Sequence, residues 1–171
     1  PMFWKLLKNT LVISLYQLVF SFPIPIILAL ILNYTPNQKL KKITQTATYA
    51  PHFISTVVLV GMMFVFFDPA AGIGTTILKG FGMSNPQVLT DPASFPHLYV
   101  WSAIWQTTGW SSIIYIAALS GVSPELHEAA IADGASKLQR IIYIDIPMLI
   151  PTAVILLILN CGNIMNLGFE K

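Results

Sequence analysis

Long runs of apolar residues, separated by shorter polar stretches, set the pattern along this chain. Four runs are long enough for a helix to cross about 30 Å of hydrocarbon, which takes about 20 apolar residues. Between the second and third runs, residues 68–97 contain four prolines and predict an irregular outer loop. The pattern predicts an all-α fold, a polytopic transmembrane helix bundle, in which residues 1–171 form a single domain. The four expected spans cover residues 11–32, 47–67, 98–119 and 148–167.

Composition agrees with this pattern and excludes one class of partner. Of the 171 residues, 55% are hydrophobic and 9% are charged, against roughly 25% charged residues in a soluble domain. The net charge of +2 is small, and the basic residues form no patch interleaved with aromatic side chains. The single cysteine, Cys161, excludes an internal disulfide. We therefore expect a chain that contacts the lipid bilayer and does not bind nucleic acid.

Residues 121–147, between the third and fourth runs, predict two short helices. The sequence Ser-Pro-Glu at 123–125 is typical of a helix start, because it offers an N-cap hydroxyl, a proline at the first helical position and an acid in the first turn. Gly134 can take the positive φ that reverses the chain, so the first helix is expected to end there. The second helix is expected over about 136–145, and the return into the membrane is expected at Pro147 and Pro151.

A spaced motif lies in the stretch 128–151, which reads EAAIADGASKLQRIIYIDIPMLIP. Three residues separate its Glu-Ala-Ala triplet from Gly134, and nine more precede an Ile-x-Ile-Pro sequence that ends at Pro147. This spacing resembles the EAA motif of permease subunits of binding-protein-dependent ATP-binding cassette (ABC) importers. The family pattern ends in Ile-x-Leu-Pro, and Ile146 stands here where leucine is usual.

Three further stretches extend the resemblance over nearly the whole chain. They are Tyr-Ala-Pro-His-Phe-Ile from residue 49, Asp-Pro-Ala-Ala-Gly-Ile-Gly from residue 68, and Leu-Ser-Gly-Val-Ser-Pro-Glu-Leu from residue 119. These stretches resemble the carbohydrate branch of the importers with the type I, MetI-like fold, and among these they are most similar to lipoprotein-type polysaccharide permeases. The resemblance implies that the chain is a fragment of a longer permease, lacking a leading span and a trailing one.

The resemblance also implies partners and a site. In the family, residues corresponding to 121–147 form a cytoplasmic coupling loop that docks in a cleft of a separate ATPase subunit. The implied partners are ABC ATPase subunits, a second permease subunit and an extracytoplasmic solute-binding protein. ATP is then bound by the ATPase partner, so this chain is expected to be no enzyme and to bind no cofactor. The expected coupling residues are Glu128, Ala129, Ala130, Asp133, Gly134, Ile144 and Pro147.

The implied function is import of oligosaccharides or other carbohydrates across the bacterial cytoplasmic membrane by alternating access. Residues 33–46, with three lysines within four positions, and the coupling loop are then cytoplasmic. Two alternatives stay open. One is a permease for a non-sugar solute, such as an amino acid, phosphate or a metal complex. The other is a passive channel or membrane scaffold, which leaves the spacing of the EAA motif unexplained.

Polar residues inside the expected spans are candidates for the translocation path, because an uncompensated polar group in hydrocarbon is costly. Amide and hydroxyl groups suit hydrogen bonds to sugar hydroxyls, and Trp105 or Trp110 offers a plane for stacking. The alternative is hydrogen bonding between helices, which contributes about 0.6 kcal/mol on average. The path candidates are Gln106, Thr107, Tyr115, Asn160 and Asn163.

Two kinds of active or metal site are not supported. The Gly-x-Ser-Ser sequence at 109–112 is similar to the Gly-x-Ser-Gly of rhomboid proteases but fails at Ser112, and no later span contains a histidine to serve as base. His52, His97 and His127 are far apart in sequence and lack metal-ligand spacing. We therefore predict no catalytic residue and no metal site, and we interpret the histidines as structural.

Overall fold

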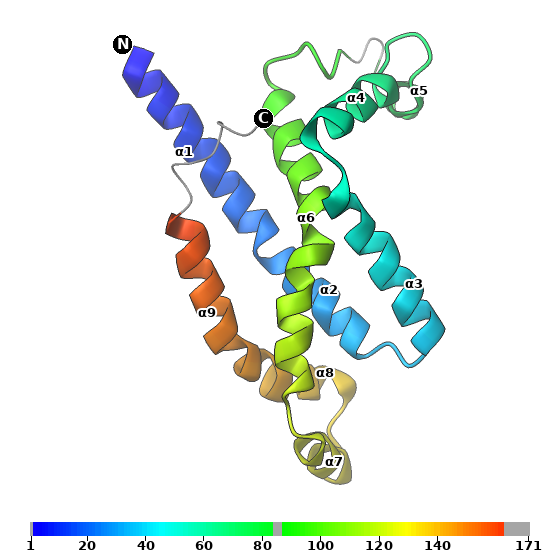
Figure 1. Cartoon of the computed structure of the whole chain (residues 1–171), viewed down its shortest axis with the longest axis vertical. Coiled ribbons are helices and arrows are strands. Elements are labelled where there is room, and N and C mark those ends of the chain that lie inside the picture. The colour runs from blue at the N-terminus through cyan, green and yellow to red at the C-terminus, as the bar shows by residue number, and fades with distance from the viewer. Residues whose placement is uncertain (1, 84–86, 163–171) are drawn as a thin grey trace.

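The protein is described here by a computed structural model, which covers residues 2–83 and 87–162. Within that part of the chain every regular element is helical, which confirms the prediction of an all-α fold. Helix α6 (Phe95–Ser120) runs through the middle of the molecule and packs against α1, α2, α3 and α9, as Figure 1 shows.

The helical segment formed by the first two helices is longer than the apolar run that predicted it. Helix α1 (Met2–Ser21) and helix α2 (Pro23–Asn33) follow one another with a break at Phe22. The break lies where Pro23 removes a backbone N–H from the helical ladder and starts α2 at its first position. Together, Met2–Asn33 is long and apolar enough to cross a membrane.

The second expected span, 47–67, is not one straight helix. Helix α3 (Gln38–Tyr49) continues as a short 3₁₀ turn, η1 (Ala50–Phe53), and α4 (Thr56–Phe66) then leaves at an angle of 104°. Pro51 cannot continue the α-helical hydrogen bonds, and the Ser55 hydroxyl accepts the Val58 N–H to start α4 anew. The apolar run therefore contains a broken span or a re-entrant segment.

The third expected span, 98–119, lies within α6. This helix has 26 residues and is long enough to cross a membrane. By composition alone, however, it is less apolar than the two described helices that qualify as membrane spans. Its middle carries several polar residues, and it is surrounded by other helices. The polar residues are Gln106, Thr107, Thr108, Ser111 and Ser112.

The loop before α6 contains helix α5 (Ile73–Gly80), and the segment after α6 contains the residues expected to form the coupling loop. Helix α7 (Pro124–Ala132) comes first. Helix α8 (Lys137–Arg140), a π-helical turn η2 (Ile141–Asp145) and α9 (Ile146–Gly162) then follow without interruption.

The second predicted helix does not end at Asp145, because Lys137–Gly162 is one continuous helix of 26 residues, apolar enough to span a membrane. The π-helical turn just before Pro147 loosens the ladder where a proline ring would crowd the preceding turn. Pro151 stands inside α9. The end of the predicted span at 148–167 lies outside the described residues.

A small core holds the central helices together. Ala29, Tyr115, Leu119 and Leu149 are buried against one another and join α2, α6 and α9. At the crossing of α6 and α3, Gly109 lies against the backbone of Thr48. Elsewhere large apolar side chains such as Val57 and Val65 are more than 70% exposed, at 82% and 75%. Such an apolar exterior is typical of a surface covered by lipid or by other membrane helices.

Candidate functional site: the coupling loop and a neighbouring cavity

Helix α7 begins and ends where the sequence predicts. The Ser123 hydroxyl accepts the Glu125 N–H at 3.3 Å, and Pro124 occupies the first helical position. At the other end Gly134 has a φ of +81°, the left-handed conformation that only glycine adopts without strain. The Gly134 N–H donates to the Ile131 carbonyl at 3.0 Å, and the Ala135 N–H donates to the Ala130 carbonyl at 2.8 Å. This pair of bonds closes a helix C-terminus with a tight reversal of the chain.

The following helix starts with a reciprocal cap. The Ser136 hydroxyl accepts the Gln139 N–H at 3.3 Å, while the Gln139 side-chain oxygen accepts the Ser136 N–H at 2.7 Å. Both helix termini that flank Gly134 are thus satisfied locally. The turn between α7 and α8 is therefore closed by hydrogen bonds among its own residues.

The predicted coupling residues fall into two groups. Helix α7 buries none of its residues, and Glu128, Ala129, Asp133 and Gly134 are all exposed along it and its end. Ala130 is half-buried on the same helix. The structure brings these five together on one projecting element (Figure 1). It does not place the other two there: Ile144 lies in η2 and Pro147 in α9, on the continuous helix that follows.

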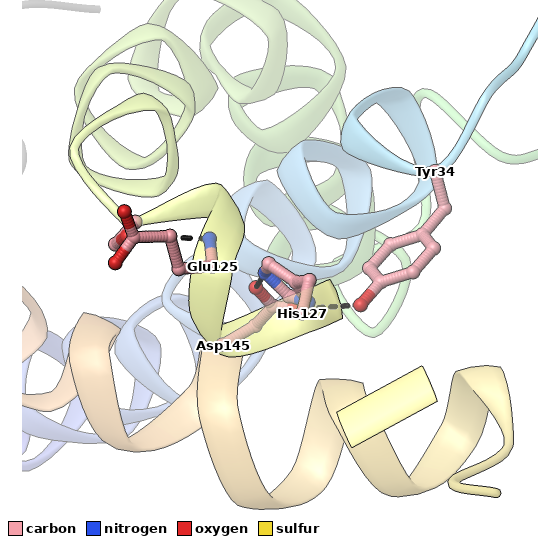
Figure 2. A network of polar contacts seen from close by, with 5 residues as sticks. Tyr34, Glu125, His127 and Asp145 are labelled. Atoms are coloured by element: carbon pink, nitrogen blue, oxygen red, sulfur yellow. Dashed lines mark hydrogen bonds and ion pairs between the residues drawn. The ribbon is translucent and has the colours of Figure 1, made fainter. Parts of the chain in front are cut away.

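A buried carboxylate lies where α7, α2 and η2 meet. Asp145, the last residue of η2, is fully buried. Its Oδ2 accepts the Tyr34 hydroxyl at 2.6 Å, and its Oδ1 lies 3.3 Å from Nε2 of His127. The guanidinium carbon of Arg140 lies 5.6 Å from the centre of the Tyr34 ring. Figure 2 shows Tyr34, His127 and Asp145 converging from three separate elements. A buried charge needs such partners, because an unpaired one is costly.

Tyr34 is the ionisable group that this arrangement changes most clearly. Burial, the hydrogen bond to Asp145 and the negative charge of Asp145 together raise the pKa of Tyr34 from 10.0 to about 12, and Arg140 opposes part of the rise. The neutral hydroxyl is therefore the form that the folded protein favours, as its role as a donor to Asp145 requires.

A titration of stability should detect this contact. Since the pKa of Tyr34 is raised on folding, its contribution is fully present below pH 10.0 and is lost as the pH approaches about 12. Below pH 10.0, we expect the thermal unfolding midpoint of the purified protein in detergent to be higher than that of a Tyr34→Phe variant. The difference between the two midpoints should shrink towards pH 12. A difference that stays constant over this range would contradict the assignment.

A cavity of about 490 Å³ lies between α1, α2, α6 and α9. Its walls include three of the predicted path residues, Thr107, Tyr115 and Asn160, together with Gln17 and Trp110. The side-chain oxygen of Gln17 is buried without a hydrogen-bond partner. The cavity thus presents neutral amide and hydroxyl groups beside an aromatic ring, a lining that suits a ligand rich in hydroxyl groups.

The remaining path candidates lie elsewhere or are not described. Gln106 does not line this cavity; its side-chain nitrogen donates to the Ile54 carbonyl at 2.6 Å and so satisfies the backbone at the bend before α4. Trp105 lines a different, mostly apolar cavity of about 630 Å³ between α4 and α6. Asn163 lies outside the described residues.

The Gly-x-Ser-Ser sequence has a structural explanation. Gly109 allows α3 to approach α6, because a Cβ there would overlap the carbonyl of Thr48. The Ser112 hydroxyl is buried and donates to the Gly109 carbonyl at 2.6 Å, within its own helix. Both residues therefore serve the packing of α6.

The contact between Tyr34, His127 and Asp145 was not predicted from the sequence, from which His127 was interpreted only as a structural histidine. One signal was available, since Asp145 is the only acid in the apolar stretch 141–159. Its partners could not be deduced, because Tyr34 and His127 lie 111 and 18 positions before it in sequence.

Comparisons with known proteins agree that this chain is similar to membrane components of transport systems. The family described as "Binding-protein-dependent transport system inner membrane component" matches residues 10–169. Protein LplB of Bacillus subtilis is 40% identical over 171 residues, which cover 100% of this chain and 54% of LplB. The polygalacturonan/rhamnogalacturonan transport system permease protein YteP of the same species is 42% identical over 170 residues, covering 99% of this chain and 53% of YteP.

Solved structures agree with the sequence relatives. The crystal structure of a bacterial ABC transporter involved in the import of the acidic polysaccharide alginate matches with a TM-score of 0.91 and 40% identity, over 95% of this chain and 57% of that one. The same values hold for the alginate transporter in complex with its alginate pentasaccharide-bound periplasmic protein. This chain thus spans about half the length of the curated relatives that it matches.

Proposed function

This chain belongs to the family of inner membrane components of binding-protein-dependent transport systems, and we propose on that basis that it is part of the permease subunit of an ABC importer for carbohydrates. The observation that carries the proposal is the coupling loop. An EAA sequence lies on a projecting helix with no buried residue, and that helix ends at a left-handed glycine in the family's spacing. A short exposed helix of this kind can dock in a cleft of a separate protein and receive a push from it.

The proposed mechanism assigns ATP hydrolysis to separate ATPase subunits. Their closure displaces α7, and the helices behind it then move between outward-facing and inward-facing arrangements. This is alternating access, in which ATP and solute shift the populations of two states by binding them unequally. The proposed partners are two ABC ATPase subunits, a second permease subunit and an extracytoplasmic solute-binding protein, in the bacterial cytoplasmic membrane.

The proposed cargo is an oligosaccharide. Relatives of this chain are named for transport of polygalacturonan or rhamnogalacturonan and of alginate. The cavity lined by Thr107, Tyr115, Trp110 and Asn160 supports this choice, because hydroxyl and amide groups can hydrogen-bond sugar hydroxyls while an aromatic ring stacks on a sugar face.

Copurification tests the class of protein. The full-length protein, extracted from native membranes in mild detergent, should bring with it an ABC ATPase and a solute-binding protein, identified by mass spectrometry. Recovery of neither from intact membranes would contradict the importer and would favour a passive channel or a scaffold. The ligand of the recovered binding protein would then separate a carbohydrate importer from one for another solute.

The cavity is tested by a change on α9. We expect Asn160→Ala to raise the half-saturating cargo concentration for uptake about 3- to 10-fold, the effect of one lost hydrogen bond. Ile158→Ala is the matched control, because Ile158 lies on the same helix, is 65% exposed and does not line the cavity. Equal uptake by both variants would remove Asn160 from the proposed path.

A further inference from the structure

We propose that Asp145, held by Tyr34 and His127, is the joint through which movement of α7 reaches α2 and α9. The inference rests on the proposed function, since it concerns how a push on the coupling loop is transmitted. It assigns a positioning role to three residues that the EAA spacing does not include.

A specific contact is needed to hold α7 at a defined angle to the rest of the helix bundle. Helix α7 buries none of its residues, so packing alone does not fix its angle to the bundle. At its end the chain reverses at Gly134, where the backbone turns sharply before α8. His127 is the α7 side chain that reaches out of the helix, to the buried carboxylate of Asp145 (Figure 2).

Asp145 is placed to connect three elements. It ends the π-helical turn and directly precedes α9, and its two oxygens face different helices. Tyr34, which donates to one oxygen, is the C-cap of α2. The turn of η2 contains more residues than an α-helical turn, so it changes the direction in which Asp145 points relative to Lys137–Arg140. Asp145 can then face α2 and α7 together.

The two contacts of Asp145 differ in strength. The contact with Tyr34 on the side of α2 is the stronger one, and the contact with His127 on α7 is the weaker one. The Tyr34 hydroxyl is at 2.6 Å, within the range of a short hydrogen bond to a carboxylate. His127 is at 3.3 Å, and its approach is not aligned as a hydrogen bond, since Asp145 Oδ1 is buried without a hydrogen-bond partner. A displacement of α7 therefore acts on Asp145 through the His127 contact, and the Tyr34 bond makes α2 move together with Asp145 and α9.

Charges around the joint are consistent with this role. Arg140 lies over the ring of Tyr34 and places a positive charge beside the tyrosine that donates to Asp145. The His127 side chain is 21% exposed, while Asp145 is at 0%. The carboxylate is thus enclosed by the bundle, while its partner on α7 is partly exposed, on the helix where an ATPase subunit would act.

The test uses the complete transporter in proteoliposomes, with ATP hydrolysis and uptake measured on the same sample. His127→Leu removes the side chain that links α7 to Asp145. We expect ATPase subunits to copurify as before, while the ATP hydrolysed per solute imported rises about tenfold. Since a folding defect would lower both activities together, this ratio separates a positioning role from a structural one.

Two further variants sharpen the result. His127→Gln keeps an N–H donor near the same place and should recover part of the coupling. Glu125→Gln, an exposed change on the same helix, should leave the ratio unchanged. A normal ratio in His127→Leu would overturn the joint while leaving the importer intact. Absence of any ATPase with the unaltered protein would instead overturn the proposed function.

Discussion

Replacing Gly134 with valine is expected to abolish solute uptake while the protein stays folded in the membrane. Gly134 has a φ of +81°, and a residue with a Cβ pays roughly 1–2 kcal/mol there. A valine Cβ would meet open space, so the damage comes from the backbone alone. The reversal between α7 and α8 would change shape, and α7 would no longer present the EAA surface at its present angle. Uptake and ATP hydrolysis, measured in membrane vesicles, check the result.

Gly82 provides the matched control for this experiment. It too has a positive φ, +93°, and open space around its Cβ position, but it lies just after α5, far along the chain from the coupling loop. Gly82→Val therefore introduces the same backbone strain elsewhere, and uptake should persist. Gly134→Asn should keep much of the activity, because asparagine tolerates the left-handed conformation. Normal uptake by Gly134→Val would count against the proposed coupling loop.

Replacing Gly109 with alanine is expected to give the largest loss of stability. The added Cβ would overlap the carbonyl carbon and oxygen of Thr48, which are backbone atoms and cannot rotate away. Helices α3 and α6 would have to separate, and overpacking of this kind costs about 1–3 kcal/mol or more. The amount of folded protein in membranes and the unfolding midpoint in detergent should both fall.

The control for this change is Gly61→Ala. Gly61 lies inside α4, and a Cβ there meets nothing within 4 Å. Alanine should therefore be tolerated at this position and can favour the helix. Equal stability of the two variants would show that α3 and α6 do not cross as closely as described.

Features set by local sequence were predictable, and α7 is the clearest case. Its start at Pro124 and its reversal at Gly134 follow from capping chemistry and from the conformational freedom of glycine, which act over a few residues. The family spacing of the EAA motif also depends only on counting. These features required no knowledge of which helices are neighbours.

Features set by tertiary contacts were not predictable in the same way. The apolar run at 47–67 contains Pro51, but the 104° bend is completed by Gln106, which bonds the Ile54 carbonyl from another helix. The helix continues through Pro147 because a π-helical turn lies just before this proline. Periodicity and capping patterns in the sequence do not indicate such a turn. The partners of Asp145 come from α2 and α7, so they become visible only when the helices are assembled.

The continuous helix Lys137–Gly162 connects the expected coupling loop with the cavity, two regions whose connection was not predicted from the sequence. Asp145, in contact with α7, and Asn160, in the wall of the cavity, lie on this same helix 15 residues apart, a rise of about 22 Å. One helix backbone therefore connects the contact with α7 to the wall of the cavity. Under the proposed coupling, a shift of Asp145 also moves Asn160, and Pro151 between them is the point at which the helix bends most easily.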